Sequence, residues 1–379
     1  LPTDIQISGF SLDFIPVETR VPLKFGSEVL SSVTCARVKV TVANKAGKQA
    51  EGWGETPLSV QWVWPSEIAH SVRHKTLIEF CRMIRARWNN FDKFGHCIEI
   101  GHDLIMEDLP HVLQKFNHSQ SFATEPMPWL AALVCASAFD LAIHDAYGVV
   151  NDLPTYQAYG KEYLSRDLSI FLQPAKDSNV FFGCKYPADF LNLNPPSKIP
   201  VWHLVGGLDP LEEEDLTGDE PGYDYPVHLR EWIFQDGLKC LKIKLRGNDS
   251  DWDYARLVRI GEIAQELGVK HLTTDFNCTV TDPAYVNEIL DRLKRDESET
   301  FRRILYVEQP FPYDLENNRI YVHSVVERKP LFMDESAHDW KHVRLGRELG
   351  WTGVALKTCK TQTGALLSLC WAKAHGMDL

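Results

Sequence analysis

Apolar and polar side chains alternate residue by residue in two stretches near the start of the chain, residues 4–17 and 33–43. Because successive side chains of a strand point to opposite faces, this alternation predicts two half-buried antiparallel strands. Residues 19–32 between them contain Pro22 and Gly26, which favour a loop. The chain is therefore predicted to open with a small antiparallel meander.

Helical periodicity follows, over about residues 66–90, 101–115 and 128–150. The last of these segments is apolar on every side, so we expect it to lie between two layers and to bury Asp140 and Asp145. No uninterrupted apolar run approaches the ~18 residues that a membrane span needs. We therefore expect no membrane association.

In the second half, short apolar strands alternate with helical segments six times. Such a series predicts a parallel sheet covered by helices, with a (β/α)-barrel as its closure. A doubly wound sheet is the rival architecture, but the segment HLVGGLDP after the first strand lacks the glycine fingerprint of a dinucleotide-binding loop. The predicted strands are 200–207, 239–245, 270–277, 304–311, 330–336 and 353–359.

These patterns divide the chain into three parts. Residues 1–155 are predicted to form an α+β capping domain, and residues 156–199, which contain NLNPPSKIP, a linker or insert. Residues 200–379 are predicted to form the β/α barrel, with strands one to six and the start of a seventh. The fold class is therefore α/β, with a modified TIM-like barrel that is incomplete at its C-terminal end. We expect the remaining strands to lie outside this chain.

Polar side chains close the predicted strands. Lys242 and Lys244 are two residues apart in KCLKIKL, so both ammonium groups point to one face of the strand. The ends of parallel strands converge at one mouth of a barrel, which is where active sites of such folds lie. We expect the two lysines to meet the polar residues of the later strands there, namely Asp275, Asn277, Glu308, Asp334, Glu335 and Lys357.

The order and spacing of KxK, DxN, VEQP, MDES and a lysine that ends the sixth strand resemble the enolase superfamily. The likeness is to its muconate-lactonizing-enzyme-like branch, the mandelate racemase/muconate lactonizing enzyme family. The segments VPLKFG, GWGETP and FDLAIHDAYG are similar to the capping domain of that family. The resemblance implies an enzyme that uses Mg²⁺, with Mn²⁺ as the alternative, and removes the proton alpha to a carboxylate through a metal-stabilised enolate. A racemase, an epimerase or a cycloisomerase is implied.

The resemblance also implies roles for individual residues. The implied metal ligands are Asp275, Glu308 and Asp334, the implied acid/base pair is Lys244 and Lys357, and Lys242 would assist the substrate carboxylate.

The chemistry of these side chains agrees with the implied roles. Three carboxylates from three strands are hard oxygen ligands, which suit Mg²⁺. The negative charge that develops when a base removes an alpha proton would be met by the metal and by Lys242. A neighbouring ammonium group and a divalent cation would lower the pKa of a lysine that acts as this base. Asn277 and Glu335 are expected to orient the lysines or the metal ligands.

Other readings of the same residues stay open. Asp275 or Asp334 alone would suit the N-cap of a following helix, and Lys242 with Lys244 would suit an exposed edge strand. A metal-free Schiff-base aldolase that uses Lys357 and a barrel that has lost catalysis are the alternative classes. Among enzymes, a dehydratase of acid sugars or hydroxy acids could use the same site.

Three further residues are candidates for substrate or lid contacts. Phe25 and Trp64 lie in segments of the capping domain, where aromatic side chains serve local packing as often as ligand contact. His338 follows MDES directly, and an exposed loop position is the stronger expectation for it.

Composition narrows the partners. A net charge of −12 and the absence of a basic stripe argue against nucleic acid as a partner. Nine scattered cysteines without a CxxC pair indicate reduced thiols and a cytoplasmic protein. We expect a small carboxylate substrate and a homo-oligomer.

Overall fold

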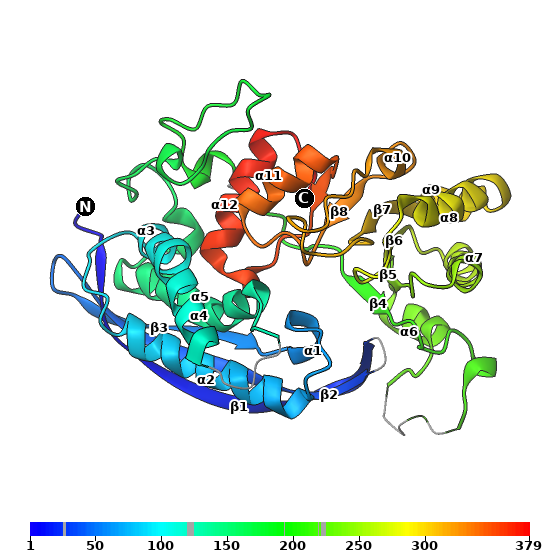
Figure 1. The fold of residues 1–379 in the computed structure, drawn as a ribbon, viewed down its shortest axis with the longest axis horizontal. Coiled ribbons are helices and arrows are strands. Elements are labelled where there is room, and N and C mark those ends of the chain that lie inside the picture. Colours follow the sequence, from blue (N-terminus) through cyan, green and yellow to red (C-terminus); the bar gives the residue numbers. More distant parts are fainter. Residues whose placement is uncertain (26–27, 120–124, 193, 219, 221–224) are drawn as a thin grey trace.

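The computed structural model describes residues 1–379 apart from 26–27, 120–124, 193, 219 and 221–224. The chain begins with an antiparallel sheet of β1 (Ile5–Phe25), β2 (Glu28–Asn44) and β3 (Gln49–Pro57), in the order β1-β2-β3. Figure 1 shows the long β1–β2 pair along one side of the molecule. The predicted meander is therefore confirmed, with a third strand added.

The prediction of a loop is wrong for residues 19–25 and 28–32, whereas Gly26 lies outside the described residues. β1 and β2 continue through this stretch and pair as far as Phe25 and Glu28. Pro22 is tolerated because the register shifts just ahead of Leu23 and because β1 is an edge strand, where a missing N–H costs no ladder bond.

The helices of the first half cover the sheet. A Cβ atom on Gly52 would lie 2.2 Å from the backbone nitrogen of Ala146, and one on Gly54 would lie 2.1 Å from the carbonyl oxygen of Ala138. Glycine at these two positions therefore lets the helix that carries Ala138 and Ala146 approach the sheet closely. The helices are α1 (Val60–Val63), α2 (His70–Trp88), α3 (Cys97–His102), the π-helix η1 (Asp103–Asp108), α4 (Leu109–Ser119) and α5 (Trp129–Val150).

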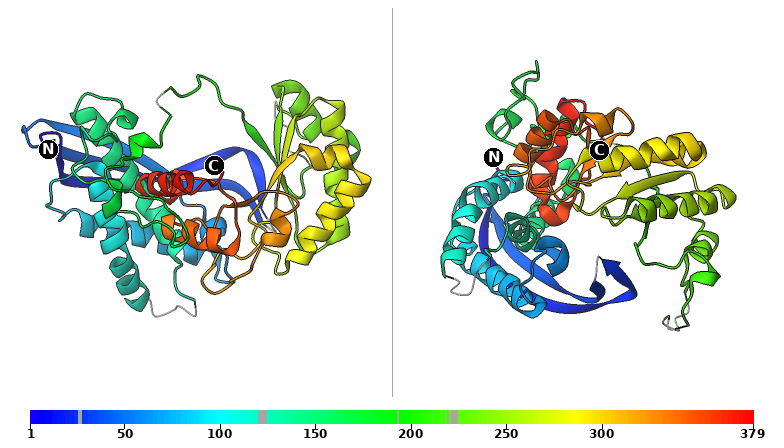
Figure 2. Two further views of the ribbon diagram at one scale, coloured as in Figure 1. Left: turned by 90° about the horizontal axis from the view of Figure 1, so that it is seen from above. Right: turned by 45° about the vertical axis from the view of Figure 1, so that its right-hand side comes forward.

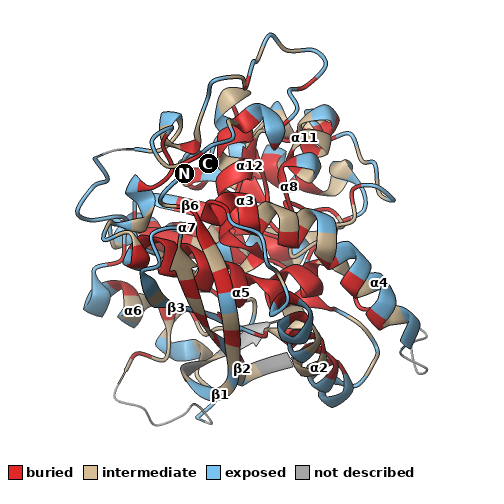
Figure 3. Cartoon of the chain, turned by 90° about the vertical axis from the view of Figure 1, so that its left-hand side faces the viewer, coloured by how far each residue is buried: buried red, intermediate tan, exposed pale blue. Residues whose placement is uncertain are grey.

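Helix α5 is buried along nearly its whole length, as Figure 3 shows. Asp140 is buried as predicted. The prediction for Asp145 is wrong, because its side chain reaches the edge of the sheet, where Oδ2 accepts a hydrogen bond from the backbone of Trp53 at 2.8 Å. Among the described residues, one helix, α5, is long enough and apolar enough to cross a membrane. However, 83% of its most apolar 18-residue segment is buried inside the protein.

The segment predicted as a linker or insert packs against the last helix of the chain. It contains the 3₁₀-helices η2 (Thr155–Gln157), η3 (Leu168–Ile170) and η4 (Pro187–Asp189). The indole nitrogen of Trp371 donates to the carbonyl oxygen of Gln173 at 2.9 Å.

The second half forms a parallel sheet in the order β4-β5-β6-β7-β8-β9, which confirms the six predicted strand–helix repeats. Its strands are β4 (Trp202–Val205), β5 (Cys240–Lys244), β6 (His271–Asp275), β7 (Ile304–Glu308), β8 (Leu331–Met333) and β9 (Gly353–Val354). Its helices are α6 (Leu229–Asp236), α7 (Ser250–Glu266), α8 (Pro283–Asp296), α9 (Ser298–Arg303), α10 (His323–Val326), α11 (Trp340–Leu349) and α12 (Gln362–Ala374), with the 3₁₀-turns η5 (Glu213–Asp215) and η6 (Thr358–Lys360).

The sheet is open between its two edge strands. Within the described ranges, no ladder of hydrogen bonds joins β4 to β9. Beyond β9, Asp378 pairs in parallel with Gly353, which places the start of a seventh strand. Figure 2 shows the yellow helices α8 and α9 outside the sheet and the red helix α12 on the side of the capping domain. The predicted architecture, an α+β cap and an incomplete β/α barrel, is confirmed.

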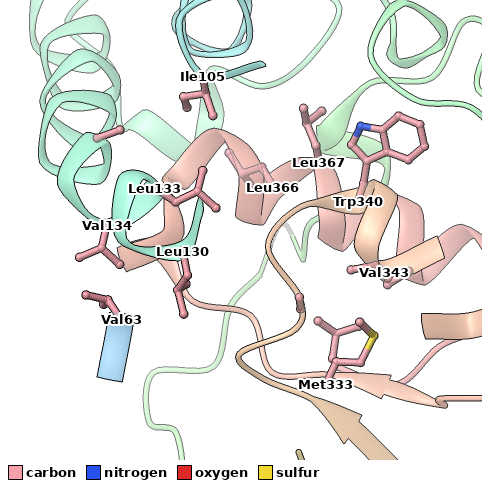
Figure 4. Packing of buried hydrophobic residues seen from close by; sticks show 14 of the residues in the cluster. Val63, Ile105, Leu130, Leu133, Val134, Met333, Trp340, Val343, Leu366 and Leu367 are labelled. Carbon is pink, nitrogen blue, oxygen red and sulfur yellow. The ribbon is translucent and has the colours of Figure 1, made fainter. Parts of the chain in front are cut away.

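A continuous hydrophobic core joins the two halves. Figure 4 shows Leu130 and Leu133 of α5 beside α12, which carries Leu366. A buried polar cluster joins the same helices, because the Asp140 carboxylate accepts hydrogen bonds from the backbone nitrogen and Oγ1 of Thr363, both at 2.7 Å. The capping domain is thereby fixed to the segment that follows β9.

Candidate active site

Three carboxylates gather at the C-terminal ends of the central strands. Asp275 ends β6, Glu308 ends β7, and Asp334 follows β8 directly. Asp275 pairs with Glu308 across the sheet, so the parallel register sets the two side chains at one level. One oxygen from each of the three residues lies within 4.8 Å of the others, and all three side chains are buried. The structure therefore brings the predicted metal ligands together.

The donor set fits a hard divalent cation. Burial, with the nearby charge of Asp275, raises the pKa of Glu308 to about 8 despite the ammonium group of Lys242. Oδ1 of Asp334 is buried without a hydrogen-bond partner. Among the ion pairs of the site, the ammonium group of Lys360 lies nearest to this oxygen, at 3.5 Å. A cation shared by three buried oxygens would satisfy Asp334 and relieve the repulsion at Glu308.

The lysines of β5 lie beside these carboxylates. Nζ of Lys242 donates to Oε1 of Glu308 at 2.5 Å and lies 3.0 Å from Oδ2 of Asp275. Nζ of Lys244 lies 2.5 Å from the same Asp275 oxygen and 2.6 Å from Oδ1 of Asn277. Burial opposes the charge of Lys242, but the carboxylates outweigh it and raise the pKa of this lysine. Both ammonium groups therefore face the cluster of three carboxylates.

Lys357 approaches from the other side of the cluster. It follows β9 and precedes η6, and its Nζ donates to Oδ2 of Asp334. The same ammonium group lies 4.8 Å from the ring centre of Trp62, which belongs to the capping domain. Burial opposes its charge, but Asp334 and Glu335 outweigh this and raise the pKa of Lys357. For Lys357 to act as a base, a cation must therefore counter these carboxylates.

The two residues expected to orient others take different positions. Asn277 has a left-handed backbone (φ 51°), its nitrogen donates to Oδ1 of Asp275 at 2.9 Å, and its side chain accepts from Lys244. Asn277 thus holds Asp275, a predicted metal ligand, and Lys244 together. Glu335 accepts a hydrogen bond from the indole nitrogen of Trp62 at 2.9 Å, which ties the capping domain to the barrel. Burial, with the charge of Asp334 nearby, raises the pKa of Glu335.

Of the three weaker candidates, the structure describes the side chains of Trp64 and His338, and neither lines the site cavities. The side chain of Phe25 lies outside the described part of the structure. Trp64 is a core residue with 2% exposure, and it is Trp62, two residues earlier, that reaches the lysines. His338 is buried rather than exposed, with its ring next to those of Tyr313 and His342.

Sequence reasoning missed two residues that hold Asp334. Lys360 is buried, and its Nζ donates to the carbonyl oxygen of Asp334. Burial lowers the pKa of Lys360. Oε1 of Gln309 accepts hydrogen bonds from the backbone nitrogen of Asp334 at 2.8 Å and from Oγ of Ser336 at 2.7 Å. The signals were a second lysine three positions after Lys357 and a glutamine directly after a metal ligand.

Two adjoining cavities open at this end of the sheet. The lysine chamber, about 260 Å³, is lined by Lys242, Lys244, Asp334 and Lys357 together with residues of the capping domain. The side chamber, about 580 Å³, continues from Lys244 along the loops that follow β4 to β7. Trp62 lines both chambers.

Comparison with known proteins places the fold. No protein-family model and no curated protein matches the chain. Among solved structures, a mandelate racemase/muconate lactonizing protein from Herpetosiphon aurantiacus matches with a TM-score of 0.58 and 18% identity, over 100% of this chain and 81% of that one. An enolase from Bradyrhizobium in complex with magnesium and mandelic acid matches with a TM-score of 0.61 and 16% identity, over 100% and 81%.

A dipeptide epimerase from Cytophaga hutchinsonii, in complex with Mg and the dipeptide D-Ala-L-Val, matches with a TM-score of 0.59 and 16% identity, over 98% of this chain and 78% of that one. The chain therefore has the fold of the enolase superfamily. Within that superfamily, the similar structures include mandelate racemase/muconate lactonizing proteins, which agrees with the predicted resemblance.

Proposed function

We propose that this protein is an enzyme that binds Mg²⁺ and removes the proton alpha to a carboxylate, as a racemase, an epimerase or a cycloisomerase. The observation that carries the proposal is the arrangement of Asp275, Glu308 and Asp334, whose oxygens lie within 4.8 Å of one another with lysines on both sides. Charge of both signs in such a buried cluster suits a substrate anion held on a cation.

The position of each side chain in the site suggests its role in the proposed reaction. Asp275, Glu308 and Asp334 would hold the metal ion. When bound, this ion supplies positive charge beside the substrate carboxylate. Lys242 donates to the substrate carboxylate and stabilises the charge that develops on it.

Lys244 and Lys357 take and return the proton at the alpha carbon. They come from β5 and from the segment after β9, with the three metal-ligand strands between them in the sheet. A proton removed by one lysine and returned by the other inverts the carbon, whereas use of a single lysine suits cycloisomerisation.

Two similar structures support the substrate class. The Bradyrhizobium enolase holds mandelic acid with magnesium, and the Cytophaga epimerase holds a dipeptide with Mg. Both ligands carry a carboxylate next to a carbon that bears a hydrogen atom. No observation of this structure favours a Schiff base at Lys357, because the ammonium group is paired with Asp334.

The test is exchange of the alpha proton of racemic carboxylic acids in D₂O, followed by NMR. We expect exchange to require Mg²⁺ and to be lost in Lys244→Ala. Lys239→Ala is the matched control, because Lys239 is exposed just before β5. Exchange that persists after chelation of the metal would contradict the proposal, and trapping of a carbonyl substrate by borohydride would favour the aldolase.

A further inference from the structure

The side chamber is much larger than the reacting part of a carboxylate substrate requires. Its volume is about 580 Å³, against about 260 Å³ for the lysine chamber, which is lined by Asp334 and the three lysines. A carboxylate and its alpha carbon fit within the smaller space, so the larger space is available for a group that does not react. The two chambers meet at Lys244, Glu335 and the segment of Trp62.

The walls of the side chamber are mainly apolar. Trp62 from the capping domain faces Leu208, Leu245, Pro312 and Tyr313 from the loops after β4, β5 and β7. Apolar walls of this kind favour an apolar ligand group, because both surfaces leave water on binding.

Two polar side chains of the chamber lining make hydrogen bonds within the protein, although Oε2 of Glu335 has no hydrogen-bond partner among the described residues. The Asn277 side chain accepts from Lys244, and Glu335 accepts from Trp62. At the rim, the guanidinium group of Arg246 lies 3.9 Å from the ring centre of Trp252. Asn277 and Oε1 of Glu335 are therefore engaged within the protein, and most of the surface that a ligand can contact in the side chamber is apolar.

We infer that the substrate is a carboxylic acid with a bulky apolar substituent, of the size of an aryl or branched alkyl group, and that this substituent lies in the side chamber next to Lys244. This inference rests on the proposed function, since the carboxylate is placed on the metal ligands. The side chamber then selects the substrate, while the lysine chamber carries out the proton transfer.

Gly207 gives a clean way to fill the side chamber. It lines the chamber, its backbone lies outside the left-handed region, and a Cβ atom there would have the carbonyl oxygen of Lys244 as its nearest neighbour, at 3.9 Å. A side chain at this position therefore extends into open space without backbone strain. Gly207→Leu should narrow the chamber, and Gly207→Ala is the matched control.

The experiment measures dissociation constants by calorimetry, in MgCl₂, for propanoic, hexanoic and 3-phenylpropanoic acids. In the wild type, affinity should rise about fourfold for each buried methylene, so hexanoic acid, which has three more methylenes, should bind roughly sixtyfold more tightly than propanoic acid. Gly207→Leu should abolish this gain in affinity and leave the affinity for propanoic acid unchanged. Gly207→Ala should keep most of the gain. Tyr313→Ala, which removes part of the chamber wall, should weaken the binding of 3-phenylpropanoic acid in particular.

Binding and proton exchange separate the two hypotheses. The side-chamber inference would be overturned if the wild type bound the three acids with equal affinity, or if Gly207→Leu lost affinity for all three acids equally. Either result would overturn it even if the alpha proton exchanges. Ranked binding without exchange of any acid would instead contradict the proposed function. Thermal unfolding of each variant shows whether it is folded. If Gly207→Leu does not fold, the affinities of Tyr313→Ala test the side-chamber inference instead.

Discussion

The side chain of Gln309 holds the segment that carries Asp334, so Gln309→Leu tests how this proposed metal ligand is positioned. Gln309 is fully buried and has a left-handed backbone (φ 32°) directly after β7. Its Oε1 accepts from the backbone of Asp334 at 2.8 Å, and from the backbone and hydroxyl of Ser336 at 3.2 and 2.7 Å. Its Nε2 donates to the carbonyl oxygen of Phe311 at 2.9 Å.

Four hydrogen bonds set the size of the expected effect. Each contributes on the order of 1 kcal/mol net, so Gln309→Leu should lower the free energy of unfolding by about 4 kcal/mol. With an unfolding entropy of roughly 2.1 cal/mol/K per residue, a chain of this length should lose about 5 °C in melting temperature. The Mg²⁺ dissociation constant should rise about tenfold, because Asp334 is no longer held in place.

Gln362→Leu is the matched control. Gln362 is also buried, but its side chain makes one hydrogen bond, from Nε2 to the hydroxyl of Tyr159 at 3.0 Å. The same substitution should therefore cost about 1 kcal/mol and leave Mg²⁺ binding unchanged. Urea unfolding and calorimetric Mg²⁺ titration measure both quantities. The reasoning is refuted if the two variants lose equal stability, or if Gln309→Leu binds Mg²⁺ as the wild type does.

Three further predictions concern the core and the turn beside the site. Burial lowers the pKa of His96 and of His144 to about 3, so below pH ~6.5 only the unfolded chain takes up these protons. Each histidine should then lower the free energy of unfolding by about 1.4 kcal/mol per pH unit, opposed by the raised pKa of Glu308 (about 8) and, below pH ~6, by that of Asp140 (about 6). In urea unfolding between pH 6 and 5, His144→Phe should therefore remove a fall of about 1.4 kcal/mol per pH unit from the wild-type profile, and an unchanged pH dependence would contradict this. Gly52→Ala should destabilise the fold by ~3 kcal/mol or more, because its Cβ would lie 2.2 Å from the backbone of α5, and wild-type stability in urea would refute that packing. Lys360→Met should weaken Mg²⁺ binding about tenfold in calorimetry, with Lys360→Arg restoring part of it, whereas equal affinity in all three proteins would exclude a positioning role for this lysine.

The sequence was sufficient where the chemistry follows from strand register. Asp275 and Glu308 close apolar runs that could only be buried strands, and parallel pairing sets such ends side by side. Lys242 and Lys244 share a face because strand side chains alternate. Asp334 and Lys357 follow short strands in the same way, so the predicted cluster forms in the folded chain.

The missed features depend on short turns that periodicity does not resolve. Trp62 and Trp64 are two residues apart at the single-turn helix α1, and only its orientation sends Trp62 to the lysines and Trp64 to the core. Lys360 is buried at the last position of the 3₁₀-turn η6, directly before Thr361, whose φ is 88°. His338 is buried by rings from other segments, which local sequence does not reveal.

The most direct test of the central claim is the anomalous scattering of crystals grown with Mn²⁺. We expect one anomalous peak in contact with carboxylate oxygens of Asp275, Glu308 and Asp334, with Lys242, Lys244 and Lys357 around it. A peak elsewhere in the molecule, or none at saturating Mn²⁺, would contradict it.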